Sequence, residues 1–135
     1  MPMTTTTASP SVDGLLAAIA GGGGETVEGL FVADAVLDAT VAGGRRHIRG
    51  PAAIAAQYGE WFRIPARFEE LDRRGTRDGE VVTYLLTWEE RGVPHGAHHC
   101  HVLTLADDGR IARERFFCGG PWSATELAAM QDEDR

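Results

Sequence analysis

The sequence predicts a single α+β domain in which a curved antiparallel or mixed sheet wraps around helices and encloses a conical pocket. Helical patterns dominate the first half of the chain, whereas four strand-like runs follow one another in the second half. Helices and antiparallel strands that are segregated along a chain are typical of α+β folds. Such a sheet must curve to cover its helices, and a curved sheet closed by helices leaves a cone-shaped space.

Size and composition limit the classes of function. The chain has 135 residues, enough to bury roughly two-thirds of its unfolded surface without disulfides or metal. The net charge of −7 argues against a nucleic-acid partner. No apolar run is long enough to cross a bilayer, and the N-terminus lacks the pattern of a secretory signal. We expect a cytoplasmic protein with no membrane partner, and the two cysteines, Cys100 and Cys118, suggest no disulfide framework.

The predicted domain spans residues 11–131, between a disordered leader (residues 1–10) and an acidic tail (residues 132–135). Ser11 can cap a first short helix. Its apolar side carries Val12, Leu15, Leu16 and Ile19. Glycines 21–24 end this helix, and because no Gly-Lys-Ser/Thr follows, they form a linker and not a phosphate loop. Residues 25–31 predict a second short helix.

A two-strand ribbon and a third helix follow. Residues 35–42 predict a strand, Gly43-Gly44 a turn and residues 45–49 the return strand. Pro51 suits the first turn of a helix. An amphipathic stripe at helical spacing then comprises Ile54, Tyr58 and Trp61.

The second half predicts a meander of four strands joined by short turns. The strands span residues 68–74, 81–90, 98–105 and 111–118. The turn signals are Asp78-Gly79, residues 92–94 and residues 107–109. Ser123 and Glu126 form a capping box for a closing helix that carries Leu127 and Met130.

The turn after Leu105 decides which side chains of the last two strands share a face, because strand side chains alternate. With a turn of two or four residues, His101 lies on the same face as Glu114, and the four-residue turn pairs them directly. A three-residue turn would instead place Glu114 on the opposite face from His101. We favour the first register, which points Arg113 and Arg115 towards water. The inward residues are then His99, His101, Leu103, Ala112, Glu114 and Phe116.

An imidazole opposite a carboxylate is an acid–base pair. Histidine ordinarily titrates near pH 6.5, so it can accept or donate a proton at neutral pH. Glu114 can orient His101 and stabilise its imidazolium, while His99 on the same face can bind a substrate oxygen. The structural alternative is a buried ion pair that only helps to line a cavity.

Four phrases in the chain resemble a known superfamily by their order and spacing: FVADAVLDAT, RGPAAIAAQY, WEERGVP and DDGRI. The chain resembles the nuclear transport factor 2 superfamily, including SnoaL-like polyketide cyclases and ketosteroid isomerases, from about residue 12 to residue 122. The resemblance implies a cystatin-like α+β barrel, a deep pocket between the concave sheet face and the helices, and a homodimer.

The resemblance also implies a catalytic set. His101 falls where ketosteroid isomerases carry their oxyanion-binding acid, and SnoaL-like cyclases similarly have a polar residue two before a histidine and an acid on the following strand. By this resemblance His99, His101 and Glu114 are candidate catalytic residues. The implied reaction is proton abstraction next to a carbonyl, without a cofactor, which leads to cyclisation, isomerisation or dehydration. The isomerase base falls near Ala39, where this chain has no base. The adjacent Asp38 is kept as a further catalytic candidate, although strand alternation points it the other way.

The expected pocket walls suit a flat, apolar molecule of polyketide, terpenoid or steroid type. The predicted substrate-binding residues are Tyr58, Trp61, Tyr84, Leu86, Trp88, Leu103 and Phe116. Two alternatives remain open. One is a non-catalytic ligand-binding or scaffold protein that uses the same pocket. The other is an enzyme in which two histidines and a carboxylate hold a divalent metal.

Overall fold

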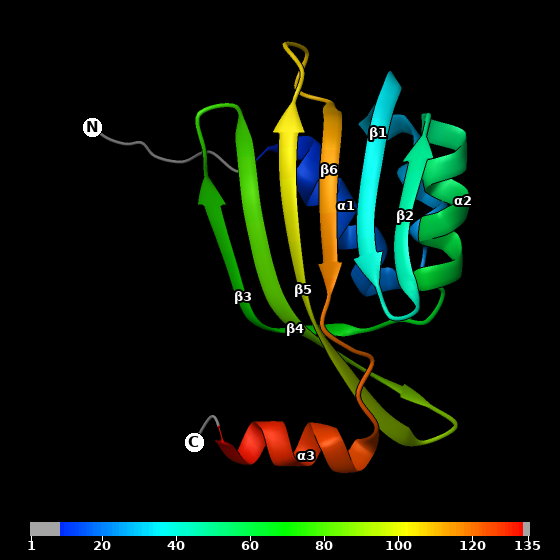
Figure 1. The fold of residues 1–135 in the computed structure, drawn as a ribbon, viewed down its shortest axis with the longest axis vertical. Helices are drawn as coiled ribbons and strands as arrows, with labels where there is room; N and C mark the ends of the chain where they lie inside the picture. Colours follow the sequence, from blue (N-terminus) through cyan, green and yellow to red (C-terminus); the bar gives the residue numbers. More distant parts are fainter. Residues whose placement is uncertain (1–8, 134–135) are drawn as a thin grey trace.

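A six-stranded sheet curves around the first helices of the chain in the computed structural model, which describes residues 9–133 (Figure 1). The helices are α1 (Pro10–Gly21), the 3-10 helix η1 (Gly24–Leu30), α2 (Pro51–Trp61) and α3 (Ala124–Glu133). The strands are β1 (Phe31–Val41), β2 (Gly44–Arg49), β3 (Arg67–Gly75), β4 (Gly79–Glu90), β5 (Val93–Leu105) and β6 (Ile111–Cys118). The predicted α+β class with a curved sheet is confirmed, and the sheet stays open.

The strands follow the order β2-β1-β6-β5-β4-β3. All neighbours are antiparallel except β1 and β6, which are parallel, so the sheet is mixed. The parallel pair joins the β1–β2 ribbon to the edge of the meander formed by β3 to β6. Figure 1 shows α1 behind the sheet, α2 beside β2, and α3 apart at the foot of the molecule.

The β4–β5 hairpin is longer than predicted. Strand β5 begins at Val93, five residues before the predicted start, because Arg91 and Gly92 alone form the turn. Both have positive φ angles, 54° and 78°, which is the backbone of the tight turns that suit hairpins. The strands therefore pair up to the turn itself. Similarly, β1 starts at Phe31, which the sequence pattern assigns to the preceding helix.

The predicted face of β5 and β6 is right, but the predicted pairing is wrong. His101 lies opposite Phe116, and Glu114 lies opposite Leu103. His101 and Glu114 are therefore diagonal neighbours on one face and not directly opposed.

A β-bulge explains the difference in pairing. Leu105 pairs with Ile111 across a five-residue loop, which alone would turn Glu114 to the outer face. The next pair is Thr104 with Arg113, so Ala112 is an extra, unpaired residue in β6. This bulge returns Glu114 to the same face as His101. As a consequence Ile111 is fully buried, whereas Ala112, which was predicted to point inward, is only partly buried.

The core lies between α1, η1, α2 and the concave face of the sheet. The helix α1 begins two residues earlier than predicted: Ser9, not Ser11, occupies the N-cap position, and its backbone N–H donates to Glu80 on β4. Gly24 lets η1 lie directly on α2, since a Cβ there would sit 2.1 Å from the carbonyl oxygen of Tyr58. Within residues 9–133, no helix is long and apolar enough to cross a membrane.

The last helix, α3, has the predicted capping box. The Ser123 N–H donates to Glu126, and the Glu126 N–H donates to the Ser123 hydroxyl. Leu127 packs against Gly96, so α3 lies on the outer face of the first part of β5 and away from the pocket. The predicted leader falls mainly on residues 1–8, which lie outside the described residues together with residues 134–135, and α3 includes the first two residues of the predicted tail.

Candidate active site

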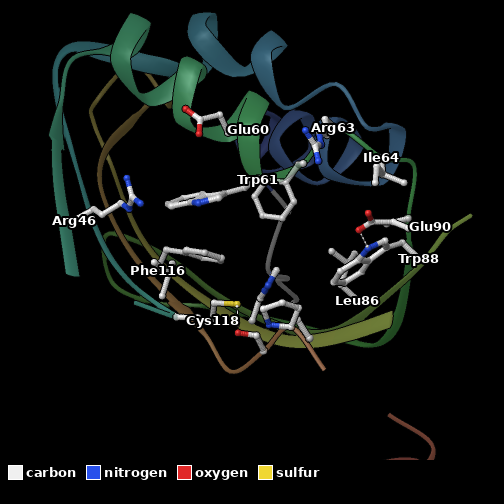
Figure 2. Close-up of a pocket in the computed structure, with 18 residues that line it drawn as sticks. Arg46, Glu60, Trp61, Arg63, Ile64, Leu86, Trp88, Glu90, Phe116 and Cys118 are labelled. Carbon is white, nitrogen blue, oxygen red and sulfur yellow. Dashed lines mark hydrogen bonds between the residues drawn. The ribbon is translucent and has the colours of Figure 1, made fainter. Parts of the chain in front are cut away.

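A pocket of about 330 Å³ opens between α2 and the concave face of the sheet. This volume lies at the lower end of the range for small-molecule sites. Figure 2 shows Trp61 of α2 facing Phe116 of β6, and Leu86 and Trp88 of β4 on another wall. The ring centroids of Trp61 and Phe116 are 5.2 Å apart. The interior walls are therefore largely aromatic and apolar.

Charged side chains surround the same pocket. Figure 2 shows Glu60 and Arg63 on the helix side, Arg46 from β2, and Glu90 beside Trp88. The indole N–H of Trp88 donates to Glu90 at 3.0 Å. Both signs of charge occur here, so the rim gives no preference for an anion or a cation.

His99 of β5 is the histidine that lines this pocket within the described residues. Its side chain is 7% exposed. The rings of Phe62 and Phe116 lie against its imidazole, with centroid distances of 5.7 and 4.8 Å. His99 thus brings one polar group to an otherwise apolar part of the pocket.

A continuous chain of hydrogen bonds runs from His99 into the core. His99 Nδ1 lies 3.1 Å from the hydroxyl of Tyr84, and that hydroxyl lies 2.7 Å from His101 Nε2. His101 Nδ1 is 2.5 Å from Glu114 Oε2. The Tyr58 hydroxyl donates to Glu114, at 2.6 Å to Oε2 and 2.9 Å to Oε1.

The strands place these side chains by alternation. His99 and His101 point to the same face of β5, and Tyr84 of β4 is the ladder partner of His99. The bulge in β6 returns Glu114 to this face, and α2, which packs on the same face, supplies Tyr58. His101 and Glu114 are both fully buried. A buried carboxylate is costly unless it accepts hydrogen bonds, which Tyr58 and His101 supply.

Burial sets the protonation of the pocket histidine. Loss of water, together with the nearby His101 and His98, lowers the pKa of His99 from 6.5 to about 3. His99 is therefore a neutral imidazole at neutral pH. Burial, together with the negative charge of Glu114, raises the pKa of Tyr84 well above its ordinary value, so Tyr84 remains a protonated phenol.

The predicted catalytic residues occupy three different environments. His99 lines the pocket, whereas His101 and Glu114 contact one another beneath it and contribute nothing to its lining. Asp38 lies on the outer face of β1, where its carboxylate pairs with Arg45 through two contacts of 2.8 and 2.6 Å. The irregularity in β1 precedes Val36 and leaves Asp38 pointing outward. Arg45 is thus the ion-pair partner of Asp38.

The predicted substrate-binding residues also divide into two groups. Those that line the pocket are Trp61, Leu86, Trp88 and Phe116. Those buried beneath or beside it are Tyr58, Tyr84 and Leu103. Sequence reasoning missed Phe62, whose only local signal is its place directly after Trp61, and it missed the charged rim. It also missed the hydrogen bonds of the two tyrosines, for which the sequence offers no local signal.

The described residues offer no ready metal site. Within residues 9–133, no group of three or more His, Cys, Asp or Glu side chains is arranged to hold a metal ion.

Comparison with known proteins identifies a family profile. The SnoaL-like domain profile matches residues 12–114. No curated protein matches the chain.

Solved structures share the fold at low sequence identity. A protein from Kribbella flavida is 22% identical, with a TM-score of 0.61, over 97% of this chain and all of its own (100%). A hypothetical protein from Catenulispora acidiphila, with a ketosteroid isomerase-like fold and bound trimethylamine, is 16% identical over 91% of this chain and 92% of its own, with a TM-score of 0.64. The epoxide hydrolase/cyclase-like enzyme SalBIII, which takes part in pyran ring formation in salinomycin, is 18% identical over 83% of this chain and 93% of its own, with a TM-score of 0.60.

Proposed function

Since the chain belongs to the SnoaL-like domain family, we propose that it is a small-molecule enzyme that uses acid–base catalysis without a cofactor. The substrate is an apolar polyketide-, terpenoid- or steroid-like molecule, and the reaction is a cyclisation, isomerisation or dehydration. His99 is the residue that exchanges a proton with the substrate. His101 and Glu114 act on the substrate through His99 and not by direct contact.

One observation carries this proposal: the buried imidazole of His99 lines an aromatic part of the pocket with one ring nitrogen free of hydrogen bonds. His99 Nδ1 is held by Tyr84, whereas His99 Nε2 has no hydrogen-bond partner among residues 9–133. The bare Nε2 of His99 can accept a proton from a carbon next to a carbonyl, and the His101–Glu114 pair behind it can stabilise the charge that this creates. The aromatic walls contributed by Trp61 and Phe116 fit a flat substrate and exclude water from the reacting carbon.

Two of the structural neighbours support the reaction class by analogy alone. SalBIII acts in ring formation, and the Catenulispora acidiphila protein has an isomerase-like fold with a small molecule bound. Chemistry of this kind needs a shaped apolar pocket and a group that moves protons, and this chain has both features.

The second candidate function is binding without turnover. It is favoured by the complete burial of His101 and Glu114, which a purely structural ion pair would also produce. The two functions differ in a single step, because only the enzyme breaks a bond of the bound molecule.

The experiment follows hydrogen–deuterium exchange at carbon. β-Tetralone and larger polycyclic ketones are incubated with the protein in D₂O, and loss of α-carbon protons is followed by NMR. Binding is followed separately by fluorescence, since Trp61 and Trp88 line the pocket. We expect His99→Gln to slow protein-catalysed exchange by about 10²–10⁴-fold while ligand binding persists.

The matched control is Arg113→Gln, a change on the outer face of the sheet. It should bind and exchange like the wild-type protein. Ketones that bind without any exchange would favour the binding function. Undiminished exchange in His99→Gln would remove His99 from the mechanism, and a panel that neither binds nor exchanges would count against an apolar ketone substrate.

We extend the proposal to a cytoplasmic homodimer that contacts neither nucleic acid nor membrane. The support is the net charge of −7 and the Phe117 side chain, which is 38% exposed on the outer face of the sheet. The oligomeric state is tested below.

A further inference from the structure

The hydrogen-bond chain behind His99 contains more ionisable groups than a pocket wall requires. Tyr84, His101 and Glu114 are all buried, and each is costly to bury without partners. Together with His99 they nevertheless form a linear chain of hydrogen bonds, in which every donor–acceptor distance is 3.1 Å or less. The order of the hydrogen bonds along this chain determines where its protons can move.

One arrangement of protons satisfies every link with both histidines neutral. His101 Nδ1–H donates to the Glu114 carboxylate, so His101 Nε2 is bare and accepts the Tyr84 hydroxyl proton. The oxygen of Tyr84 then accepts from His99 Nδ1–H. His99 Nε2 is left bare and acts as a base at the pocket.

A second arrangement satisfies the same links with one more proton. His101 is then an imidazolium that donates to Glu114 from Nδ1 and to the Tyr84 oxygen from Nε2. The Tyr84 hydroxyl donates to His99 Nδ1. His99 is still neutral, but its proton is now on Nε2, where it acts as an acid towards the pocket.

We propose that Tyr84, His101 and Glu114 form a proton relay that lets His99 change tautomer instead of charge. Tyr84 and His101 are positioning residues, since neither lines the pocket. The inference rests on the proposed function for its use in catalysis, but the coupling of the two histidines exists without substrate.

The step balances without a further reactant. The substrate C–H bond breaks and a bond forms from its proton to His99 Nε2, leaving the electron pair on the substrate as an enolate. The proton on His99 Nδ1 passes to the Tyr84 oxygen, and the original Tyr84 proton passes to His101 Nε2. The positive charge comes to rest on His101, and the reverse transfers return a proton to the substrate.

The surroundings explain why the charge should rest at His101. Charge on His99 would lie against the rings of Phe62 and Phe116, which offer no counter-charge. Charge on His101 lies against the carboxylate of Glu114. The low pKa of His99, about 3, agrees with this division of roles.

The other titratable groups around the hydrogen-bond chain supply no second anion at neutral pH. From α2, Tyr58 donates to Glu114. From β6 and β5, Cys118 and Cys100 have pKa values raised by burial and remain thiols. His98 is on β5 next to His99 but is exposed on the outer face. The Glu114 carboxylate is therefore the counter-ion on which the relay depends.

The test is a pH titration by ¹⁵N NMR of the histidine rings in the full-length protein without ligand, since the ¹⁵N shifts distinguish bare from protonated ring nitrogens. In the wild-type protein, protonation of His101 and transfer of the His99 proton from Nδ1 to Nε2 should share one midpoint. In Tyr84→Phe, which removes the bridging oxygen, we expect this shared midpoint to be lost. Tyr58→Phe is the matched control: it removes a hydroxyl from the same carboxylate but lies outside the path, so the two midpoints should still coincide.

Two results would overturn the relay: a His99 tautomer that does not change while His101 titrates, or a shared midpoint that persists in Tyr84→Phe. Glu114→Gln is a second, nearly isosteric variant should Tyr84→Phe fail to fold. It removes the counter-ion of the relay, so His99 should stay in one tautomer throughout the titration, and tautomer switching in this variant would equally contradict the relay. Because no substrate is present, these results are separate from the carbon-exchange test: coupled histidines without exchange would retain the relay and reject the enzyme.

Discussion

At the scale of single residues, the chemistry of the site depends on where burial leaves a charge. His99 and His101 are two residues apart on the same strand, yet one lines the pocket and the other is sealed beneath it. His99 lies against aromatic rings and stays neutral, whereas His101 contacts a carboxylate. Desolvation keeps His99 neutral at neutral pH and also makes it a weak base, so the charge of an accepted proton is better placed on His101 beside Glu114.

The low pKa of His99 predicts a pH-dependent stability that His99→Gln removes. The folded-state pKa, about 3, is below the ordinary value of 6.5, so the unfolded state binds more protons between these values. The contribution of neutral His99 to the free energy of unfolding is complete above about pH 6.5 and is lost at about 1.4 kcal/mol per pH unit below it. Urea unfolding of both proteins measures this contribution directly.

The wild-type protein should lose about 2 kcal/mol of stability between pH 7 and pH 5 that His99→Gln does not lose. Titrating groups outside the hydrogen-bond chain are common to the two proteins and cancel in the difference. A difference in unfolding free energy that stays constant with pH would contradict the neutral, desolvated state of His99.

At the scale of elements, close backbone contacts set the geometry of the site. The helix η1 lies on α2 at Gly24, whose backbone N–H donates to the carbonyl of Phe62 at 3.1 Å. A Cβ on Gly24 would meet the backbone carbonyl of Tyr58, which cannot rotate away as a side chain can. This contact determines how deeply α2 presents Tyr58 to Glu114.

We expect Gly24→Ala to destabilise the protein by about 2–3 kcal/mol, because α2 and η1 must separate to admit the methyl group. The matched control is Gly21→Ala at the end of α1, where nothing lies within 4 Å of the position that a Cβ would take. There, alanine should be neutral or stabilising by up to about 1 kcal/mol, since it favours the helix. Chemical denaturation compares them, and equal effects at the two positions would show that the close contact does not constrain α2.

At the scale of the whole molecule, the sheet has two unlike faces. Its concave face holds the core and the pocket, while α3 lies on the outer face of the first part of β5 and leaves much of the outer face uncovered. Leu85, Cys100 and Phe117 come from adjacent strands β4, β5 and β6 on that outer face. Of these three side chains Leu85 is buried and Phe117 is exposed, so we propose that Phe117 contacts a second copy of the chain.

The proposed homodimer predicts a molecular mass of twice 14.5 kDa in sedimentation equilibrium. Phe117→Glu should shift the protein towards the monomer, because it places a charge in the apolar contact. Glu28→Lys, an exposed change on η1, is the control and should leave the mass unchanged. A monomeric wild-type protein, or a dimer indifferent to Phe117→Glu, would reject this interface.

Much of the architecture could be predicted because it depends on local rules. Strand alternation correctly predicted that His99, His101 and Glu114 share one face, and the capping box correctly predicted the start of α3. The pairing of β5 with β6 could not be predicted, since the bulge at Ala112 adjusts the register to the packing around it. The outward pairing of Asp38 with Arg45 also depended on the strand opposite β1.

Sequence patterns alone predict the α+β class, the order of the elements and the shared face of the three ionisable residues. These features follow from turn chemistry and side-chain periodicity over a few residues, which covalent geometry imposes directly. By contrast, long-range packing places His99 at the pocket and buries His101 and Glu114 behind it. That depth depends on α2, whose Tyr58 reaches Glu114 across 56 residues of sequence. Contacts of such separation are set by the packing of whole elements, which no local pattern encodes.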